Sequence, residues 1–120
     1  MFYSVGKAVV AALRHPAETF NRALIVQSFV VNSKQILKEL EKQTGGEPWE
    51  VSSYTLDDLR EAEKKGWAAG NPKAVSYTLR RIWSEGGTLY EKTDNERIGL
   101  KEEDLETLED AVKRELTTGY

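Results

Sequence analysis

One short apolar segment constrains the fold of this chain more than any other feature. Residues 23–31 read ALIVQSFVV, a run that is rich in β-branched side chains and broken only by Gln27 and Ser28. Such a run is far too short to span a bilayer and is typical of a strand buried within a sheet. We therefore expect a buried β-strand over residues 23–31.

A helix and a second strand are expected directly after it. Asn32 or Ser33 is a suitable N-cap for a helix that reaches about Gln43. Residues 49–54 are expected to form a second strand, because Trp49 and Val51 alternate with Glu50 and Ser52. The order strand, helix, strand predicts a parallel pair with a right-handed crossover.

Helical periodicity covers most of the remaining chain. Apolar side chains recur every three to four positions in residues 4–14, 56–69, 72–85 and 101–116. Thr55 is a good N-cap for the second of these helices, and Asn71 for the third. The predicted fold class is α/β (α+β): about five helices and a short, mainly parallel strand pair (a βαβ unit), in a single domain over residues 1–120.

The expected elements leave apolar surface without cover. A two-stranded sheet is marginal by itself and has two open edges. The helix over residues 4–14 is apolar over more than half of its circumference. We therefore expect a homodimer in which the sheet is completed by dimerisation; the alternative is that helices of the same chain cover the strands.

Charge and composition exclude several classes of function. Lys and Arg number 17 against 20 Asp and Glu, a net charge of −3 without a basic run, so no nucleic-acid partner is expected. The chain has no cysteine and one histidine, which argues against a metal site. No glycine-rich loop joins a strand to a helix, so no cofactor is expected. With neither a secretion signal nor a membrane segment, we expect a cytoplasmic protein.

Glu63 is the candidate catalytic residue. On a helical wheel of residues 56–69, stepping about 100° per residue, Glu63 falls within the apolar arc beside Trp67. A carboxyl group on an apolar face has a raised pKa and can serve as a general acid. The alternative is that Glu63 forms an ion pair with Arg60 or Lys64.

Aromatic side chains are the candidate walls of a binding pocket. Trp49, Trp67 and Tyr54 could enclose a flat organic ligand, with core packing as the alternative, whereas Trp83 is expected in the core. His15, before Pro16, is expected to cap a helix or lie in a polar loop rather than shuttle protons.

Charged residues elsewhere are given structural roles. Asp57 and Asp58 are expected as helix-start charges. The acidic stretch 102–110 is expected to be a solvated helix face.

Residues spread over most of the chain carry a family resemblance. They are VGKAVV (5–10), HPAETFNR (15–22), VQSF (26–29), QTGG (43–46), WEV (49–51) and the stretch from RRIW to Tyr90 (80–90). The sequence resembles the C-terminal part of fungal NmrA-like (isoflavone-reductase-like) proteins, which are atypical short-chain dehydrogenases. The resemblance implies a substrate-side domain that lacks the Rossmann half, so the family's nicotinamide chemistry is not carried over.

Chains of this truncated kind are similar to the quinolone epoxide rearrangement proteins of fungal alkaloid pathways. That likeness implies a cofactor-independent, redox-neutral isomerase acting on an apolar aromatic substrate: an epoxide is protonated, opens toward a carbocation and rearranges to a carbonyl. Glu63 would be the acid, and Trp49, Trp67 and Tyr54 would contact the substrate. The alternatives are a non-catalytic NmrA-like module that binds a small molecule or a protein, and a fragment of a longer reductase.

Overall fold

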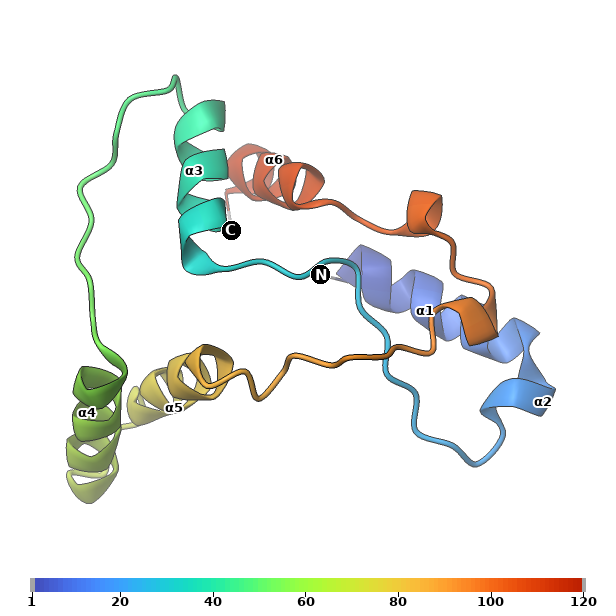
Figure 1. Ribbon diagram of the computed structural model, residues 1–120, viewed down its shortest axis with the longest axis horizontal. Coiled ribbons are helices and arrows are strands. Elements are labelled where there is room, and N and C mark those ends of the chain that lie inside the picture. The colour runs from blue at the N-terminus through green and yellow to red at the C-terminus, as the bar shows by residue number, and fades with distance from the viewer. Residues whose placement is uncertain (1, 120) are drawn as a thin grey trace. The chain divides into compact units, whose positions relative to one another are not determined.

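The computed structural model describes residues 2–119, and the side chains of residues 4–119. Two compact units can be distinguished (Figure 1): unit 1 is Met1–Trp49 with Glu91–Tyr120, and unit 2 is Glu50–Tyr90. Each unit is described by itself below. A single domain over residues 1–120 stays a prediction.

Unit 1 is built from helices that come from both ends of the chain. They are α1 (Phe2–Arg14), α2 (Pro16–Thr19), α3 (Ser33–Gln43), α6 (Leu108–Thr118) and the short 3-10 helices η1 (Glu96–Ile98) and η2 (Glu102–Asp104). Helix α3 packs against α6, and α1 contacts α2 and η1. The centre of the core is Ile98, which is 1% exposed, together with Ala8 and Leu100.

Unit 2 is a helical hairpin of α4 (Leu56–Ala68) and α5 (Ala74–Ser84). Ala74 is completely buried where the two helices meet, and Gly66 of α4 lies directly against it. Gly70 has a φ of +65° in the connection, a conformation that favours glycine. The hairpin therefore depends on small residues at the helix contact and on a glycine in the turn.

The predicted α/β fold class is wrong, because residues 2–119, which the structure describes, contain helices and no β-strand. The reason lies in how residues 23–31 satisfy their backbone. The amide of Ile25 donates to Asp94 Oδ2 (2.9 Å), and the Ile25 carbonyl accepts from the Asp94 amide (2.6 Å). Gln27 donates its amide to Asn95 Oδ1 (3.2 Å) and accepts from Asn95 Nδ2 (2.7 Å). Side chains of one loop thus replace a partner strand.

The second predicted strand is wrong as well. Residues 49–54 form an irregular, exposed connection in which the side chains of Val51 and Tyr54 are 55% and 65% exposed. The Trp49 amide donates to Glu41 Oε1 (3.0 Å). Alternation of apolar and polar residues is a signal for a strand only when one face is buried, which is not the case here. Residues 2–119 therefore contain no open sheet edge that would favour a dimer.

Helix starts follow their capping residues. The predicted N-caps Asn32 and Thr55 are confirmed, each with a reciprocal capping box. Helix α5 begins later than predicted, at Ala74, and Asn71 does not cap it. The last helix begins at Leu108 rather than Lys101, because Thr107 and Asp110 form the capping box there.

Among the residues that the structure describes, none of the helices has both the length and the apolar character needed to cross a bilayer.

Candidate functional site

An open groove of about 620 Å³ in unit 1 is the candidate site. Its walls come from α1, residues 26–31, α3, α6 and the segment before α6. Most of the lining side chains are apolar: Val5, Ala8, Val26, Phe29, Val31, Ile36, Leu40, Leu100, Leu105, Leu108, Ala111 and Val112. A concave, largely apolar surface of this size is typical of a site for a small organic molecule.

A largely covered carboxylate interrupts the apolar wall. The side chain of Glu106 is 10% exposed and forms an ion pair through Oε1 with Arg114 Nη1, whose side chain is 33% exposed. Ser4 Oγ donates to Glu106 Oε2 at 3.4 Å, a long hydrogen bond. All three residues line the groove. The charge of Glu106 is therefore balanced, while its oxygens remain at the wall of an apolar site.

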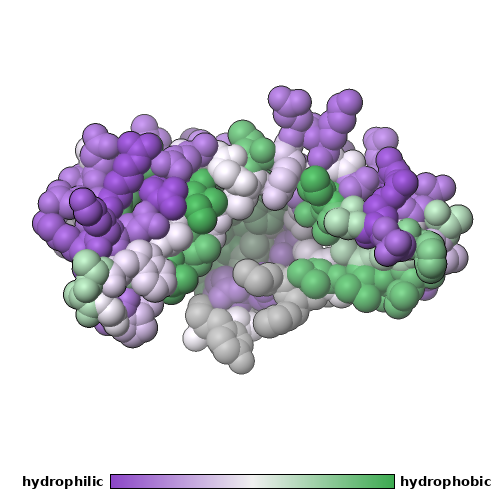
Figure 2. Space-filling model, turned by 90° about the horizontal axis from the view of Figure 1, so that it is seen from below, coloured by the Kyte–Doolittle hydropathy of each residue, from purple (hydrophilic) through white to green (hydrophobic). Residues whose placement is uncertain are grey.

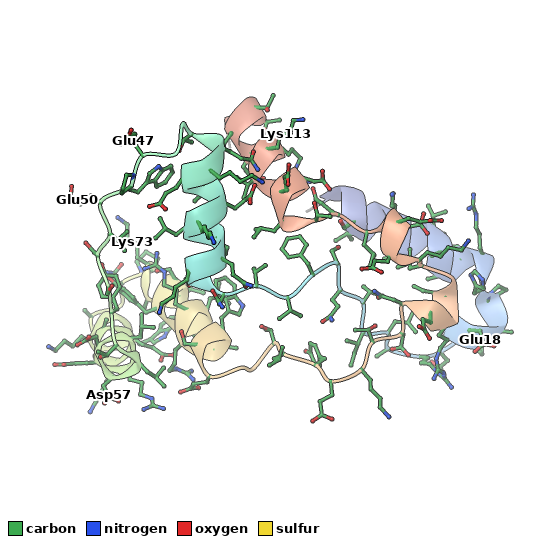
Figure 3. All side chains as sticks on the ribbon, turned by 45° about the horizontal axis from the view of Figure 1, so that its top comes forward. Glu18, Glu47, Glu50, Asp57, Lys73 and Lys113 are labelled. Atoms are coloured by element: carbon green, nitrogen blue, oxygen red, sulfur yellow. The ribbon has the colours of Figure 1, made fainter. Side chains whose placement is uncertain are left out.

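The start of α6 explains the position of Glu106. Thr107 caps α6, so Glu106 is the last residue before the helix and its side chain lies near the first turns of α6. Arg114, two turns into α6, pairs with it, whereas Lys113 lies on the side of α6 turned away from α3 (Figure 3). The expected solvated face over residues 102–110 is thus wrong at Glu106. The one signal in the sequence is that Glu106 stands between two leucines, Leu105 and Leu108.

A second cavity in unit 1, of about 590 Å³, has a more polar lining. Lys7, Arg14, His15 and Asp104 contribute to its wall, and Lys7 Nζ donates to the Asp104 carbonyl (2.8 Å). His15 Nδ1 lies 2.8 Å from the Ala11 carbonyl, four residues earlier, so the ring caps the end of α1. The prediction of a capping histidine is confirmed.

Glu63, the predicted acid, lies in unit 2 and forms an ion pair. Arg81 Nε donates to Glu63 Oε2 (2.5 Å) and Arg81 Nη2 to Glu63 Oε1 (3.2 Å), while the Glu63 side chain is 16% exposed. Hydrogen bonding from Arg81, and then from Thr78, lowers the pKa of Glu63. The predicted rise of this pKa is therefore wrong. Glu63 does face inward, but a cation of the neighbouring helix compensates it, rather than Arg60 or Lys64.

The ion pair of Glu63 is one end of a chain of charges between α4 and α5. Arg81 Nη1 also donates to Glu85 Oε2 (2.8 Å), and Arg60 Nη2 donates to Glu85 Oε1 (2.9 Å). Arg60 reaches back to Asp57 Oδ1 (3.1 Å), at the exposed start of α4 (Figure 3). Hydrogen bonds to Glu63 and Glu85 raise the pKa of Arg81 further. This network holds the hairpin together across its polar side.

The aromatic candidates are distributed over both units. Trp67 Nε1 donates to Thr78 Oγ1 (3.0 Å) and is 54% exposed, and Tyr54 is 65% exposed; both belong to unit 2. Trp49 belongs to unit 1, where its indole donates to Thr44 Oγ1 (3.0 Å). Among the described residues that line the two cavities, none of these three appears. Trp83 is 57% exposed, so its predicted place in the core is wrong.

The chain is distantly similar to two proteins named Oxidoreductase poxI, one from the fungus Penicillium oxalicum and one from its strain 114-2. Each is 27% identical over 106 residues, which cover 82% of this chain and 33% of the relative. The chain thus spans about a third of the length of the curated relatives it matches. No family model matches the sequence. No solved structure matches it.

Proposed function

We propose that unit 1 binds an apolar, aromatic small molecule in the groove between α1, α3 and α6. The observation that carries this proposal is the groove of about 620 Å³, with its mainly apolar walls and the ion pair of Glu106 and Arg114 at its wall. Burial of a ring system against such walls is favourable by roughly 25 cal/mol for each Å² of apolar surface removed from water. The few polar groups would orient the ligand.

A neutral apolar fluorophore tests this function. N-phenyl-1-naphthylamine should bind the wild-type chain saturably with one molecule per groove. In Ala111→Phe the new phenyl ring occupies part of the groove. The ligand then buries less apolar surface, and binding should weaken about tenfold or more. Ala17→Phe adds the same side chain to the exposed helix α2, outside the groove, and should leave the affinity unchanged.

Circular dichroism of both variants should give the helix content of the wild type, which shows that a loss of binding is not a loss of folding. Equal affinity in the wild type and in Ala111→Phe would contradict the proposal, as would fluorescence that rises without saturation.

A second, more specific candidate is a cofactor-independent, redox-neutral isomerase of fungal secondary metabolism. Two things support it: the resemblance to fungal epoxide rearrangement proteins, and the similarity to a fungal protein named as an oxidoreductase. The substrate would be a quinolone-type epoxide. Protonation of the epoxide oxygen breaks one C–O bond, a group migrates to the cationic carbon, and loss of the hydroxyl proton leaves a carbonyl of the same composition.

Glu63, in unit 2, is the proposed acid in this candidate, and its ion pair with Arg81 gives the proposal a specific test. Arg81 lowers the pKa of Glu63, so the proton-donating form is scarce near neutral pH. Glu63→Gln should abolish product formation. Arg81→Met removes the cation and should shift the loss of activity to higher pH. The measurement is product analysis by NMR and mass spectrometry over a pH series. Full activity in Glu63→Gln excludes Glu63 as the acid.

A homodimer and a cytoplasmic location remain part of the proposal. The dimer is supported by α1, in which the side chains of Val5, Val9 and Leu13 are 54%, 53% and 76% exposed. Figure 2 shows a hydrophobic band, in green, along the lower right of the molecule. An exposed apolar surface that continues along a helix is typical of an interaction site. The non-catalytic alternative, a regulatory module, would use the same groove or surface without turnover.

A further inference from the structure

The wall of the groove contains a largely covered carboxylate, that of Glu106, among mainly apolar side chains. Glu106 is 10% exposed, lines the groove, and follows Leu105 in the segment that leads into α6. A carboxylate loses its hydration when it is buried, so it persists there only with compensating partners. Glu106 has Arg114 as that partner.

The compensation leaves hydrogen-bonding capacity on Glu106. A carboxylate has about four lone-pair sites. Among the described residues, Arg114 takes one through Oε1, and Ser4 contributes a hydrogen bond to Oε2 whose 3.4 Å length makes it weak. Arg114 is shared with Glu115, whose Oε1 lies 3.8 Å from Arg114 Nη2, so this part of the wall carries more acceptor than donor capacity and favours a ligand that donates a hydrogen bond.

From this geometry, and resting on the proposed small-molecule function, we infer that Glu106 selects ligands. It accepts a hydrogen bond from an apolar ring compound that carries a ring N–H, and it discriminates against ring compounds that lack this donor. A ligand without the donor would displace water from the carboxylate without replacing its hydrogen bond. An acceptor left unsatisfied in this way is the usual source of strong discrimination in apolar sites. Glu106 is thus a specificity-determining residue of the groove.

Indole and 1-methylindole are a matched pair of probes for this inference. They share the ring system and differ in the N–H that could reach Glu106. Binding is followed by the chemical shifts of backbone amides around the groove in ¹⁵N-labelled protein. A hydrogen bond to a charged group contributes about 1.5–3 kcal/mol, so wild-type protein should bind indole about tenfold or more tightly than 1-methylindole.

Two variants assign the preference to Glu106. Glu106→Leu removes both acceptor oxygens, and the ratio of the two affinities should fall to about one while 1-methylindole still binds. Glu106→Gln keeps the shape of the side chain and a neutral acceptor, and it should reduce the preference several-fold even where the leucine variant folds poorly. Glu103→Gln, whose side chain is 78% exposed and lies outside the groove, is the matched control and should retain the wild-type ratio.

The outcomes separate this inference from the proposed function. Equal binding of the two probes to the wild type overturns the role of Glu106 and leaves the groove as a binding site. A preference for indole that survives in Glu106→Gln and Glu106→Leu overturns it too. Absence of binding by both probes, with no groove amide shifted, overturns the inference together with the proposed function.

Discussion

Gly66 and Ala74 bring α4 and α5 into closer contact than any larger side chain would permit. A β-carbon added at Gly66 would lie 2.9 Å from the β-carbon of Ala74, which is fully buried. Real β-carbons do not approach this closely, so the two helices would have to separate. The two residues therefore determine the distance between the helices of unit 2.

Substitution at Gly66 should open this contact. Gly66→Ala is expected to lower the free energy of unfolding by about 1–3 kcal/mol, the usual cost of overpacking. Gly6→Ala is the matched control: it lies within α1, a β-carbon there meets nothing within 4 Å, and alanine should stabilise the helix by about 0.5–1 kcal/mol. Urea unfolding followed by circular dichroism measures both. A neutral Gly66→Ala would show that the helices move apart freely.

The side chain of Asn95 should hold residues 23–31 in place. Asn95→Ala removes one donor and one acceptor from Gln27, and we expect a loss of about 1–3 kcal/mol because the freed backbone groups lie in a part-buried place. Hydrogen exchange of the Gln27 amide should accelerate in the variant. Lys92→Ala, at an exposed position of the same unit, is the control. Unchanged protection of Gln27 would show that other contacts hold the segment.

The ion pair of Glu63 predicts a dependence of stability on pH. The pKa of Glu63 is lowered in the folded chain from its ordinary value of 4.5. A carboxyl whose folded pKa is depressed contributes stability above its unfolded pKa, and this contribution is lost as the pH falls through the folded pKa.

Urea midpoints measured over an acidic pH series should reveal this contribution. The difference between wild type and Glu63→Gln should be constant above 4.5 and shrink as the pH falls below that value. Carboxyls that share no partner with Glu63, such as Asp58 and Asp110, have a lowered pKa in both proteins and cancel, so the difference reports Glu63 together with Glu85, which shares Arg81 with it. A difference that grows on acidification would mean that the pKa of Glu63 is raised.

Self-association is expected to depend on α1. Leu13→Glu, at a side chain that is 76% exposed, should convert the proposed dimer to a monomer, because a charge cannot be buried in an apolar contact without a partner. Leu89→Glu, at a side chain of unit 2 that is 64% exposed, should leave the dimer intact. Light scattering coupled to size-exclusion chromatography gives the mass of each. A monomeric wild type would contradict the expectation.

Local chemistry in the sequence was sufficient to locate several helices. Asn32 and Thr55 were recognisable as N-caps, because capping depends on residues within one turn. His15 was recognisable as a capping residue for the same reason: its partner, the Ala11 carbonyl, lies four residues away. The composition likewise excluded thiolate chemistry without reference to any fold.

Tertiary contacts decided the rest. Residues 23–31 have the composition of a strand, but Asp94 and Asn95, about 68 positions away in the sequence, supply the hydrogen bonds that a strand would have supplied. Glu63 was placed correctly on an inward face, but its pKa follows from Arg81 on the next helix. Glu106 is buried because α6 starts beyond it and presents Arg114. Periodicity and capping are local, whereas the partner of a buried polar group depends on which distant segment the chain brings to it.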